Sequence, residues 1–346
     1  MCRRQRLGGR SGVISESARV ARPQTIGEAV RLLANHGSEA MVIAGGTDVV
    51  PNLQMRLFAP RVLVDLKPLR MLSGVEFSER DGLRIGALTT LTQLLATPVV
   101  REKFPVLASA VGTIAGPLQR NMGTLGGNLC LETRCRWYNQ SHLWRTALGG
   151  CLKKDGPICH VAPSGQFCWA AWSGDSAPAL LTLDAEIEIA GASGTRRIPL
   201  SEFYKNDGMD RITLRQGEIL TAVHVSPRMA GRRGAYHKLR VRGSIDYPLA
   251  GVAVTMDVDA GGTCRDARVA LTAVNPAPVL VRQANEWLTG QKPSAELIER
   301  VAHAAIQTGK PLTTSASTPV YRRDMVKLFT RRALEETWLA HNGSSR

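Results

Sequence analysis

The sequence lacks the features that would place it among membrane or secreted proteins. Its 346 residues contain no run approaching the roughly 20 apolar residues of a membrane-spanning helix. The first segment, residues 1–20, is basic, and no apolar stretch of a secretory signal follows it. We expect this segment to be either a disordered extension or the product of a start codon placed too early. These absences predict a cytoplasmic protein without a membrane span, in which cysteines stay reduced.

Familiar nucleotide and iron–sulfur motifs are also missing. There is no G-x-G-x-x-G fingerprint and no P-loop, so any dinucleotide site is not of Rossmann type. No C-x₂-C pair suits a [2Fe–2S] ferredoxin domain.

The chain is strongly basic but poor in aromatic residues. Its formal net charge is +15, and Phe, Trp and Tyr together make up 5% of the residues. A basic surface is only the electrostatic part of a nucleic-acid-binding signature, and the arginines here are spread along the chain. We therefore expect no nucleic-acid partner, and we interpret the charge as faces that meet acidic partners.

Regular patterns predict a mixed fold. Residues 25–66 give a small βαβ unit, whose helix begins with a capping box of Thr25 and Glu28. Residues 82–100 predict a strand followed by a helix that Thr89 or Thr90 caps. Residues 227–234 are rich in Pro, Gly and Arg and predict a domain boundary. After this boundary a β-hairpin and amphipathic helices are expected, so the last third is α+β.

Two glycine turns follow apolar elements. They read "AGGTDVVP" (44–51) and "TLGGN" (124–128). Glycine pairs let a ligand approach the main chain closely, and successive N–H groups form a nest that binds anions. Either turn alone is most simply an ordinary tight turn, but two of them with hydroxyl and amide neighbours favour a diphosphate site.

A third motif, "YHKLRVRGSIDYPLAGVAV" (236–254), places Lys238, Arg242 and Asp246 at a repeat of four. Alone it reads as a charged strand end and loop. In order, "AGGTDVVP", "TLGGN", "GDSAPALLTLDA" and "KLRVRGSIDYPLAGVAV" resemble the FAD-carrying medium (β) subunit of the molybdenum hydroxylases, the family of xanthine and carbon monoxide dehydrogenases. The resemblance covers about residues 24–340.

The resemblance implies an α+β fold class. A PCMH-type FAD-binding domain of two α/β subdomains would be followed by a C-terminal domain with a three-stranded sheet and helices, similar to the C-terminal domain of the CO dehydrogenase flavoprotein. The expected bounds are 21–228 for the FAD-binding domain, with subdomains at about 21–75 and 76–228, an insertion at 131–172, and 229–342 for the C-terminal domain.

The resemblance also implies which residues bind FAD. Both glycine turns would hold the pyrophosphate, Asp175 would bind on the flavin or ribitol side, and Lys238 would sit near the isoalloxazine carbonyls. Its charge would stabilise the reduced anionic flavin. For Arg242 and Asp246, a role as structural partners of this lysine and no such role are equally compatible with the sequence. The expected FAD ligands are Ala44, Gly45, Gly46, Thr47, Asp48, Gly123, Thr124, Gly126, Gly127, Asn128, Asp175 and Lys238.

The segment between Asn128 and Asp175 is longer than the short loop that most of the family has there, and it is rich in cysteine. Cys135, Cys151, Cys159 and Cys168 are candidate metal ligands, whereas Cys130 reads as a small buried residue of the flavin domain. Four thiolates hold zinc or an iron–sulfur cluster, and the spacing alone names neither. We favour a cluster over zinc or free cysteines, because a flavin protein gains from a one-electron centre. Five nearby aromatic residues would exclude water from it: Trp137, Trp144, Phe167, Trp169 and Trp172.

The inserted segment resembles the one in the β subunit of 4-hydroxybenzoyl-CoA reductase, where it carries a [4Fe–4S] cluster. This implies electron flow from reduced ferredoxin through the cluster and FAD to [2Fe–2S] and molybdenum centres on partner subunits, for reductive dehydroxylation of 4-hydroxybenzoyl-CoA in anaerobic aromatic degradation. Five cations in the insertion would steer an acidic ferredoxin, unless they are solvated loop positions or subunit contacts. They are Arg134, Arg136, Arg145, Lys153 and Lys154.

Two other interpretations remain at this point. One is an FAD subunit of an oxidative xanthine, aldehyde or CO dehydrogenase that uses NAD or a quinone. The other is a non-enzymatic assembly module with a zinc-stapled loop. The chain carries nothing that resembles a molybdopterin site, so we expect it to contain no catalytic residue. We expect it to work with a molybdenum large subunit and a [2Fe–2S] small subunit, as a dimer of heterotrimers.

Overall fold

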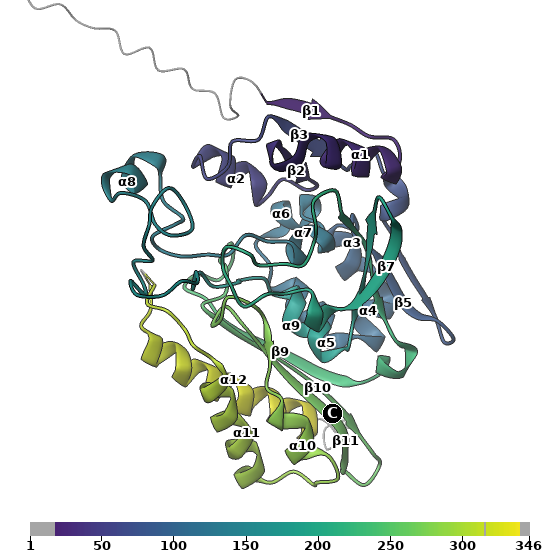
Figure 1. Ribbon diagram of the computed structural model, residues 1–346. Helices are drawn as coiled ribbons and strands as arrows, with labels where there is room; N and C mark the ends of the chain where they lie inside the picture. The colour runs from purple at the N-terminus through teal and green to yellow at the C-terminus, as the bar shows by residue number, and fades with distance from the viewer. Residues whose placement is uncertain (1–17, 315, 340–346) are drawn as a thin grey trace, which may run out of the picture.

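The computed structural model describes residues 18–314 and 316–339, so most of the predicted N-terminal extension lies outside the described residues. Three sheets follow one another along the chain (Figure 1). No helix in the described part of the chain is long and apolar enough to cross a membrane.

The first sheet is parallel and small. Its strands β1 (Arg19–Ala21), β3 (Val62–Asp65) and β2 (Ala40–Ile43) lie in that order, accompanied by α1 (Ile26–His36) and α2 (Val49–Gln54). Thr25 caps α1 by accepting the Glu28 N–H at 3.1 Å, as predicted. The return bond differs, because the Glu28 carboxylate accepts from the N–H of Gln24 rather than from that of Thr25. The capping box is therefore displaced by one residue.

The second sheet has five antiparallel strands, in the order β4 (Val75–Ser78), β5 (Gly82–Gly86), β8 (Ile219–Val225), β6 (Glu186–Gly191) and β7 (Gly194–Pro199). Thr90 and Gln93 form a complete capping box at the start of α3, which selects Thr90 over Thr89. The helices between β5 and β6 are α3 (Leu91–Ala96), α4 (Pro98–Lys103), α5 (Pro105–Gly112), α6 (Pro117–Met122), α7 (Leu125–Leu129), α8 (His142–Ala147) and α9 (Ser176–Thr182).

The third sheet belongs to the C-terminal part. Its order is β12 (Val279–Leu280), β11 (Cys264–Thr272), β10 (Ala250–Val258) and β9 (Arg233–Leu239), so a two-residue strand extends the expected three. The predicted hairpin is β10 and β11, paired antiparallel. The helices are α10 (Gln283–Leu288), α11 (Ala295–Thr308) and α12 (Pro319–Leu339).

Side-chain alternation ties this third sheet to both of its neighbouring layers. Val252 and Val254 on β10 join the core formed with α11 and α12. Ala253 between them joins the core of the preceding domain. Successive strand residues point to opposite faces, so both faces of β10 are buried. The C-terminal domain is thus packed directly against α5 and α9. The segments that follow α5 and precede α9 line the site described next.

Candidate functional site

The two glycine turns meet at the junction of the first and second sheets. The first turn joins β2 to α2, and Gly46 within it has φ of +75°, which favours glycine. A Cβ added to Gly45 would lie 2.1 Å from the carbonyl oxygen of Met122, which precedes the second turn. The backbones of the two turns are therefore in contact, although 77 positions separate Gly45 from Met122 in the sequence.

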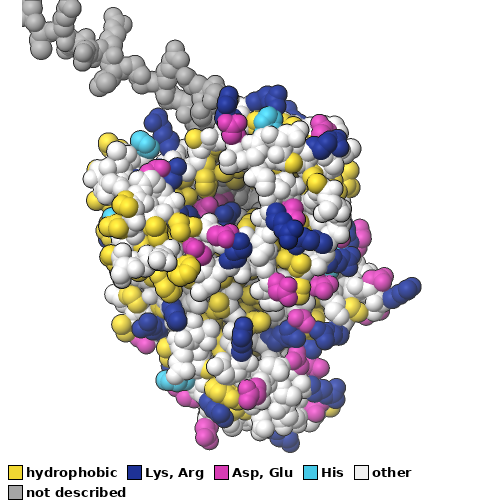
Figure 2. Space-filling view, viewed as in Figure 1, with side chains coloured by type: hydrophobic (Ala, Val, Ile, Leu, Met, Phe, Trp, Pro, Cys, Tyr) yellow, Lys and Arg dark blue, Asp and Glu magenta, His cyan; other side chains and the backbone are white. Residues whose placement is uncertain are grey.

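A cavity of about 610 Å³ opens where the turns meet, and the hollow is visible on the face drawn in Figure 2. Apolar side chains from several elements, among them Leu66, Leu88 and Ile219, line part of it. The structure brings eleven of the twelve predicted FAD ligands to its wall: Ala44, Gly45, Gly46, Thr47, Asp48, Gly123, Thr124, Gly126, Gly127, Asn128 and Asp175.

The twelfth predicted residue, Lys238, does not line this cavity. Its Nζ donates to Asp175 Oδ2 at 2.9 Å and to the carbonyl of Thr113 at 3.0 Å. Tyr236 donates its hydroxyl to the other Asp175 oxygen at 2.6 Å. Both charged side chains are almost fully buried, at 2% and 4% exposed. Lys238 thus lies behind Asp175, and the carboxylate stands between it and the cavity.

Burial opposes the charge on both members of this pair. It raises the pKa of Asp175, although Lys238 and Tyr236 act in the opposite direction. It lowers the pKa of Lys238, although Asp175 acts against this. Each group is kept ionised mainly by the other, so neither is expected to tolerate loss of its partner.

Arg242 and Asp246 pair with each other rather than with Lys238. Arg242 Nε donates to Asp246 Oδ1 at 2.7 Å, and the Arg242 N–H donates to Oδ2 at 2.6 Å. These hydrogen bonds lower the pKa of Asp246, which lines the cavity. The spacing of four between Arg242 and Asp246 therefore reflects an ion pair that closes a loop at the cavity edge. These two residues are not partners of Lys238.

Asp48 joins three parts of the chain at the cavity wall. It pairs with Arg134 of the insertion, and it accepts the hydroxyl of Tyr247 at 3.0 Å. The guanidinium of Arg134 also lies over the Tyr247 ring, 4.2 Å from its centroid. Arg134 Nε is buried without a hydrogen-bond partner among the described residues, and Arg134 lines the cavity. This unpaired donor and the bare glycine backbones suit an anionic, dinucleotide-sized ligand.

Sequence patterns missed Arg134, Glu132, Arg211 and Tyr247 as cavity residues. Tyr247 lies inside the third motif, so that motif contained a usable signal. Arg134 and Glu132 lie in the insertion, where their charges were assigned to its surface.

The four candidate cysteines line a second, smaller and mostly enclosed cavity. It is bounded by Cys135, Cys151, Cys159 and Cys168, together with Trp137, Tyr138 and His160. Cys130 lines the larger cavity instead. Across residues 18–314 and 316–339, no group of three or more His, Cys, Asp or Glu side chains is arranged to hold a metal ion. This finding supports neither a zinc staple nor an iron–sulfur cluster.

Burial raises the pKa of two of these thiols, those of Cys168 and Cys135. It raises the pKa of Cys168 to about 11, although the Ala170 N–H and the charge of Lys153 act against this, and it raises that of Cys135. Soft thiol donors facing one enclosed space fit a thiophilic group whose binding displaces protons.

The predicted aromatic coat is only partly present, since Trp137 alone of the five residues lines the cysteine cavity. Trp137 lies against His160 and Trp144, with ring centroids at 5.0 and 5.8 Å. Phe167 is 59% exposed, whereas Trp172 is buried in the core of the second sheet. Trp169 lines a separate groove beside α11. Sequence proximity therefore overestimated the coat, because Phe167 is exposed to solvent, Trp169 lines another groove and Trp172 packs into the core.

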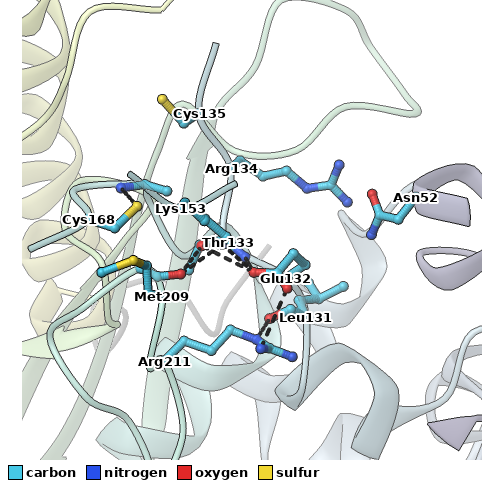
Figure 3. Close-up of polar contacts among 12 residues, drawn as sticks. Asn52, Leu131, Glu132, Thr133, Arg134, Cys135, Lys153, Cys168, Met209 and Arg211 are labelled. Atoms are coloured by element: carbon cyan, nitrogen blue, oxygen red, sulfur yellow. Dashed lines mark hydrogen bonds and ion pairs between the residues drawn. The ribbon is translucent and has the colours of Figure 1, made fainter. Parts of the chain in front are cut away.

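A buried ion pair lies between the two cavities. Lys153 pairs with Glu132, and each side chain is 7% exposed. Lys153 Nζ also donates to Thr133 Oγ1 and to the carbonyl of Gly208 at 2.7 Å. Figure 3 shows Lys153 between Cys168 and Glu132, with Arg211 on the far side of the carboxylate. Lys153 lines the cysteine cavity, whereas Glu132 and Arg211 line the larger one.

The five cations of the insertion do not form one exposed basic patch. Lys153 and Arg145 are buried, and Arg134 is paired with Asp48. Lys154 is partly exposed and pairs with Asp155, and Arg136 stacks on Trp137. Most of the positive charge that would steer an acidic ferredoxin is therefore committed to internal contacts.

Arg145 fastens the insertion to the turn that follows α2. Its guanidinium donates to the carbonyls of Met55 (3.1 Å), Arg56 (2.9 Å) and Gln140. We expect Arg145→Met to leave these acceptors unpaired and to lower the free energy of unfolding by about 2–3 kcal/mol, since hydrogen bonds to charged groups contribute about 1.5–3 kcal/mol. Urea denaturation measures the loss, and limited proteolysis should cut the variant first within residues 136–170. Equal protection of variant and wild type would contradict this role, and Arg136→Met is the control.

Two family models match the chain, one in each of its two parts. The family model "FAD binding domain in molybdopterin dehydrogenase" matches residues 16–228, and "CO dehydrogenase flavoprotein C-terminal domain" matches residues 234–337. The chain is 28% identical to the putative xanthine dehydrogenase FAD-binding subunit XdhB of Escherichia coli K12, over 93% of this chain and 96% of that one.

Two further comparisons agree with these matches. The aldehyde oxidoreductase FAD-binding subunit PaoB of E. coli K12 is 34% identical over 72% of this chain and 79% of its own length. A chain in the crystal structure of carbon monoxide dehydrogenase from Hydrogenophaga pseudoflava superposes with a TM-score of 0.77 at 27% identity, covering 94% of this chain and 99% of that one.

Proposed function

Because the chain belongs to the family of FAD-binding subunits of the molybdenum hydroxylases, we propose that it carries FAD in the 610 Å³ cavity and passes electrons within a molybdenum-dependent oxidoreductase. FAD supplies exchange of electrons in pairs or singly. The observation that carries the proposal is the meeting of both glycine turns at one cavity wall.

The chain's own residues would divide the work of holding the cofactor. The backbones of residues 44–48 and 123–128 receive the pyrophosphate, and Arg134 Nε offers a further donor. Asp175 faces the flavin or ribitol side, and Lys238 acts through it as a positioning residue. The apolar lining at Leu66, Leu88 and Ile219 excludes water from the rest of the cofactor.

We further propose that Cys135, Cys151, Cys159 and Cys168 hold a [4Fe–4S] cluster. The supporting observation is that all four cysteines line one small cavity. The segment from Leu131 to Cys135 connects this cavity to the larger one, because Leu131, Glu132 and Arg134 line the larger and Cys135 the smaller. Arg134 on the wall of the flavin cavity is thus the residue directly before the proposed cluster ligand Cys135.

The names of the relatives favour an enzyme that oxidises its substrate. The relatives compared above carry the names of a xanthine dehydrogenase, an aldehyde oxidoreductase and a carbon monoxide dehydrogenase. The highest identity among the three is to the aldehyde oxidoreductase subunit. We therefore propose an oxidative enzyme, with an aldehyde as the first substrate class to test and NAD or a quinone as acceptor.

Reduction of 4-hydroxybenzoyl-CoA by ferredoxin is the second candidate. The cysteine-lined cavity is the observation that favours it. Against it stand the names of the relatives and the internal pairing of the cations that would attract ferredoxin. For either direction we propose a molybdenum large subunit and a [2Fe–2S] small subunit as partners, since XdhB and PaoB are themselves described as subunits.

Cofactor analysis of anaerobically purified protein tests the cluster. We expect about four iron and four sulfide per chain in the wild type. We expect Cys151→Ser to lose most of the iron and the low-temperature EPR signal of the reduced cluster, while it retains FAD. Cys130→Ser is the matched control, because Cys130 lines the other cavity. Zinc without iron in the wild type, or full iron in Cys151→Ser, would refute the ligand assignment.

A further inference from the structure

We propose that Lys153 is the fixed positive charge that sets the reduction potential at the cysteine cavity, and that Glu132 positions it there. The inference rests on the proposed cluster. Lys153 lines the cavity together with all four candidate ligands, and it is the only lysine or arginine in its lining among the described residues.

Lys153 is held too firmly to act as a mobile surface charge. Glu132, Thr133 and the carbonyl of Gly208 accept its three N–H groups, and the Tyr138 ring lies 4.4 Å from Nζ. Together these contacts fix the ammonium on the cavity side of the carboxylate. Its side chain is 7% exposed, so solvent screens the charge weakly.

The surrounding charges leave the cavity with a net positive neighbour. Glu132 contacts both Lys153 and Arg211, the latter at 3.5 Å, so two cations share one carboxylate. Reduction adds an electron to a thiolate-bound cluster, and net charge near the cluster is one of the factors that set its potential. A positive charge stabilises the reduced form, so Lys153 raises the potential.

The chain offers a matched control in the next residue. Lys154 has the same charge and lies in the same inserted segment, but it does not line the cavity and pairs with Asp155 at 3.4 Å. Removing its charge should leave the potential unchanged if position, and not overall charge, is what matters.

The test is a potentiometric titration followed by EPR on the purified protein, using wild type, Lys153→Met, Lys153→Gln, Lys153→Arg and Lys154→Met. We expect Lys153→Met to decrease the ratio of reduced to oxidised cluster about tenfold at a fixed potential, which for one electron corresponds to about 59 mV. Lys153→Gln should behave similarly, because it keeps a hydrogen-bond donor and loses the charge. Lys153→Arg should restore most of the wild-type value, and Lys154→Met should match it.

An unchanged potential in an iron-replete Lys153→Met or Lys153→Gln protein would overturn the proposal, as would an equal shift in Lys154→Met. If both neutral Lys153 variants lose their iron while Lys154→Met retains it, the lysine is structural and the proposal is also wrong. Wild-type protein without iron and sulfide would overturn the cluster assignment itself, and this is read before any variant is compared.

Discussion

Replacing Gly45 with alanine is expected to weaken FAD binding by about one to two orders of magnitude. The added Cβ would lie 2.1 Å from the carbonyl oxygen and 2.7 Å from the carbonyl carbon of Met122. Both are backbone atoms, so no flexible side chain can move aside, and the two turns must separate. Overpacking of this kind costs about 1–3 kcal/mol, and each 1.4 kcal/mol is a factor of about ten in affinity.

A fluorescence titration of the apoprotein with FAD measures this change, and Gly243→Ala is the control. A Cβ on Gly243 meets nothing within 4 Å, and this residue lies in the loop that carries Asp246 and Tyr247 to the cavity. Thermal denaturation of both apoproteins separates loss of binding from loss of folding. If Gly45→Ala binds FAD as tightly as the wild type does, the two turns do not form one cofactor cradle.

Removing either member of the Asp175–Lys238 pair is expected to destabilise the fold by about 3–5 kcal/mol. Both side chains are buried, and a buried ion left without its partner carries the full penalty of desolvation. Lys238→Met leaves Asp175 with only the Tyr236 hydroxyl, and Asp175→Leu leaves Lys238 with only the Thr113 carbonyl. Urea unfolding of the apoproteins measures the loss.

The double variant Asp175→Leu/Lys238→Met should recover much of this loss, because it buries no unpaired charge. Replacement of a buried pair by apolar residues is often close to neutral. Lys205→Met serves as the exposed comparison. Its pair with Asp210 spans 2.6 Å but is largely solvated, so a change below about 1 kcal/mol is expected. Strictly additive losses in the double variant would show that the two charges do not depend on each other.

Local rules explain what the sequence allowed us to predict. The caps at Thr25 and Thr90 join a side chain to an N–H three residues away, so local sequence predicted the first and narrowed the second to Thr89 or Thr90. The glycine turns follow apolar elements, and their hydroxyl and amide neighbours favoured one diphosphate site. The structure places both turns at one cavity. The family fold and the flavin role were predicted through the same short segments, and the comparisons support both.

The contacts that sequence patterns could not supply join distant positions. Arg134 pairs with Asp48, and Lys153 pairs with Glu132. The charges in the sequence do not show that these two cations make internal contacts. The aromatic coat failed for a related reason, since Trp172 is drawn into the core of the second sheet. The reductase assignment depended on the insertion alone, and names of relatives that match most of the chain favour oxidation instead.

The two ends of the insertion are joined to each other by hydrogen bonds. Arg134 and Ala171 exchange both backbone hydrogen bonds, at 2.7 and 2.8 Å, and the Asn128 side chain accepts from Ser176. Arg145 grips the turn after α2 only through main-chain carbonyls, which any sequence provides. We therefore expect the inserted segment between these hydrogen bonds to tolerate insertions, deletions and substitutions while the flavin domain keeps its geometry. The paired backbone at its base thus lets the inserted segment form a separate lobe without breaking the hydrogen bonds of the flavin domain.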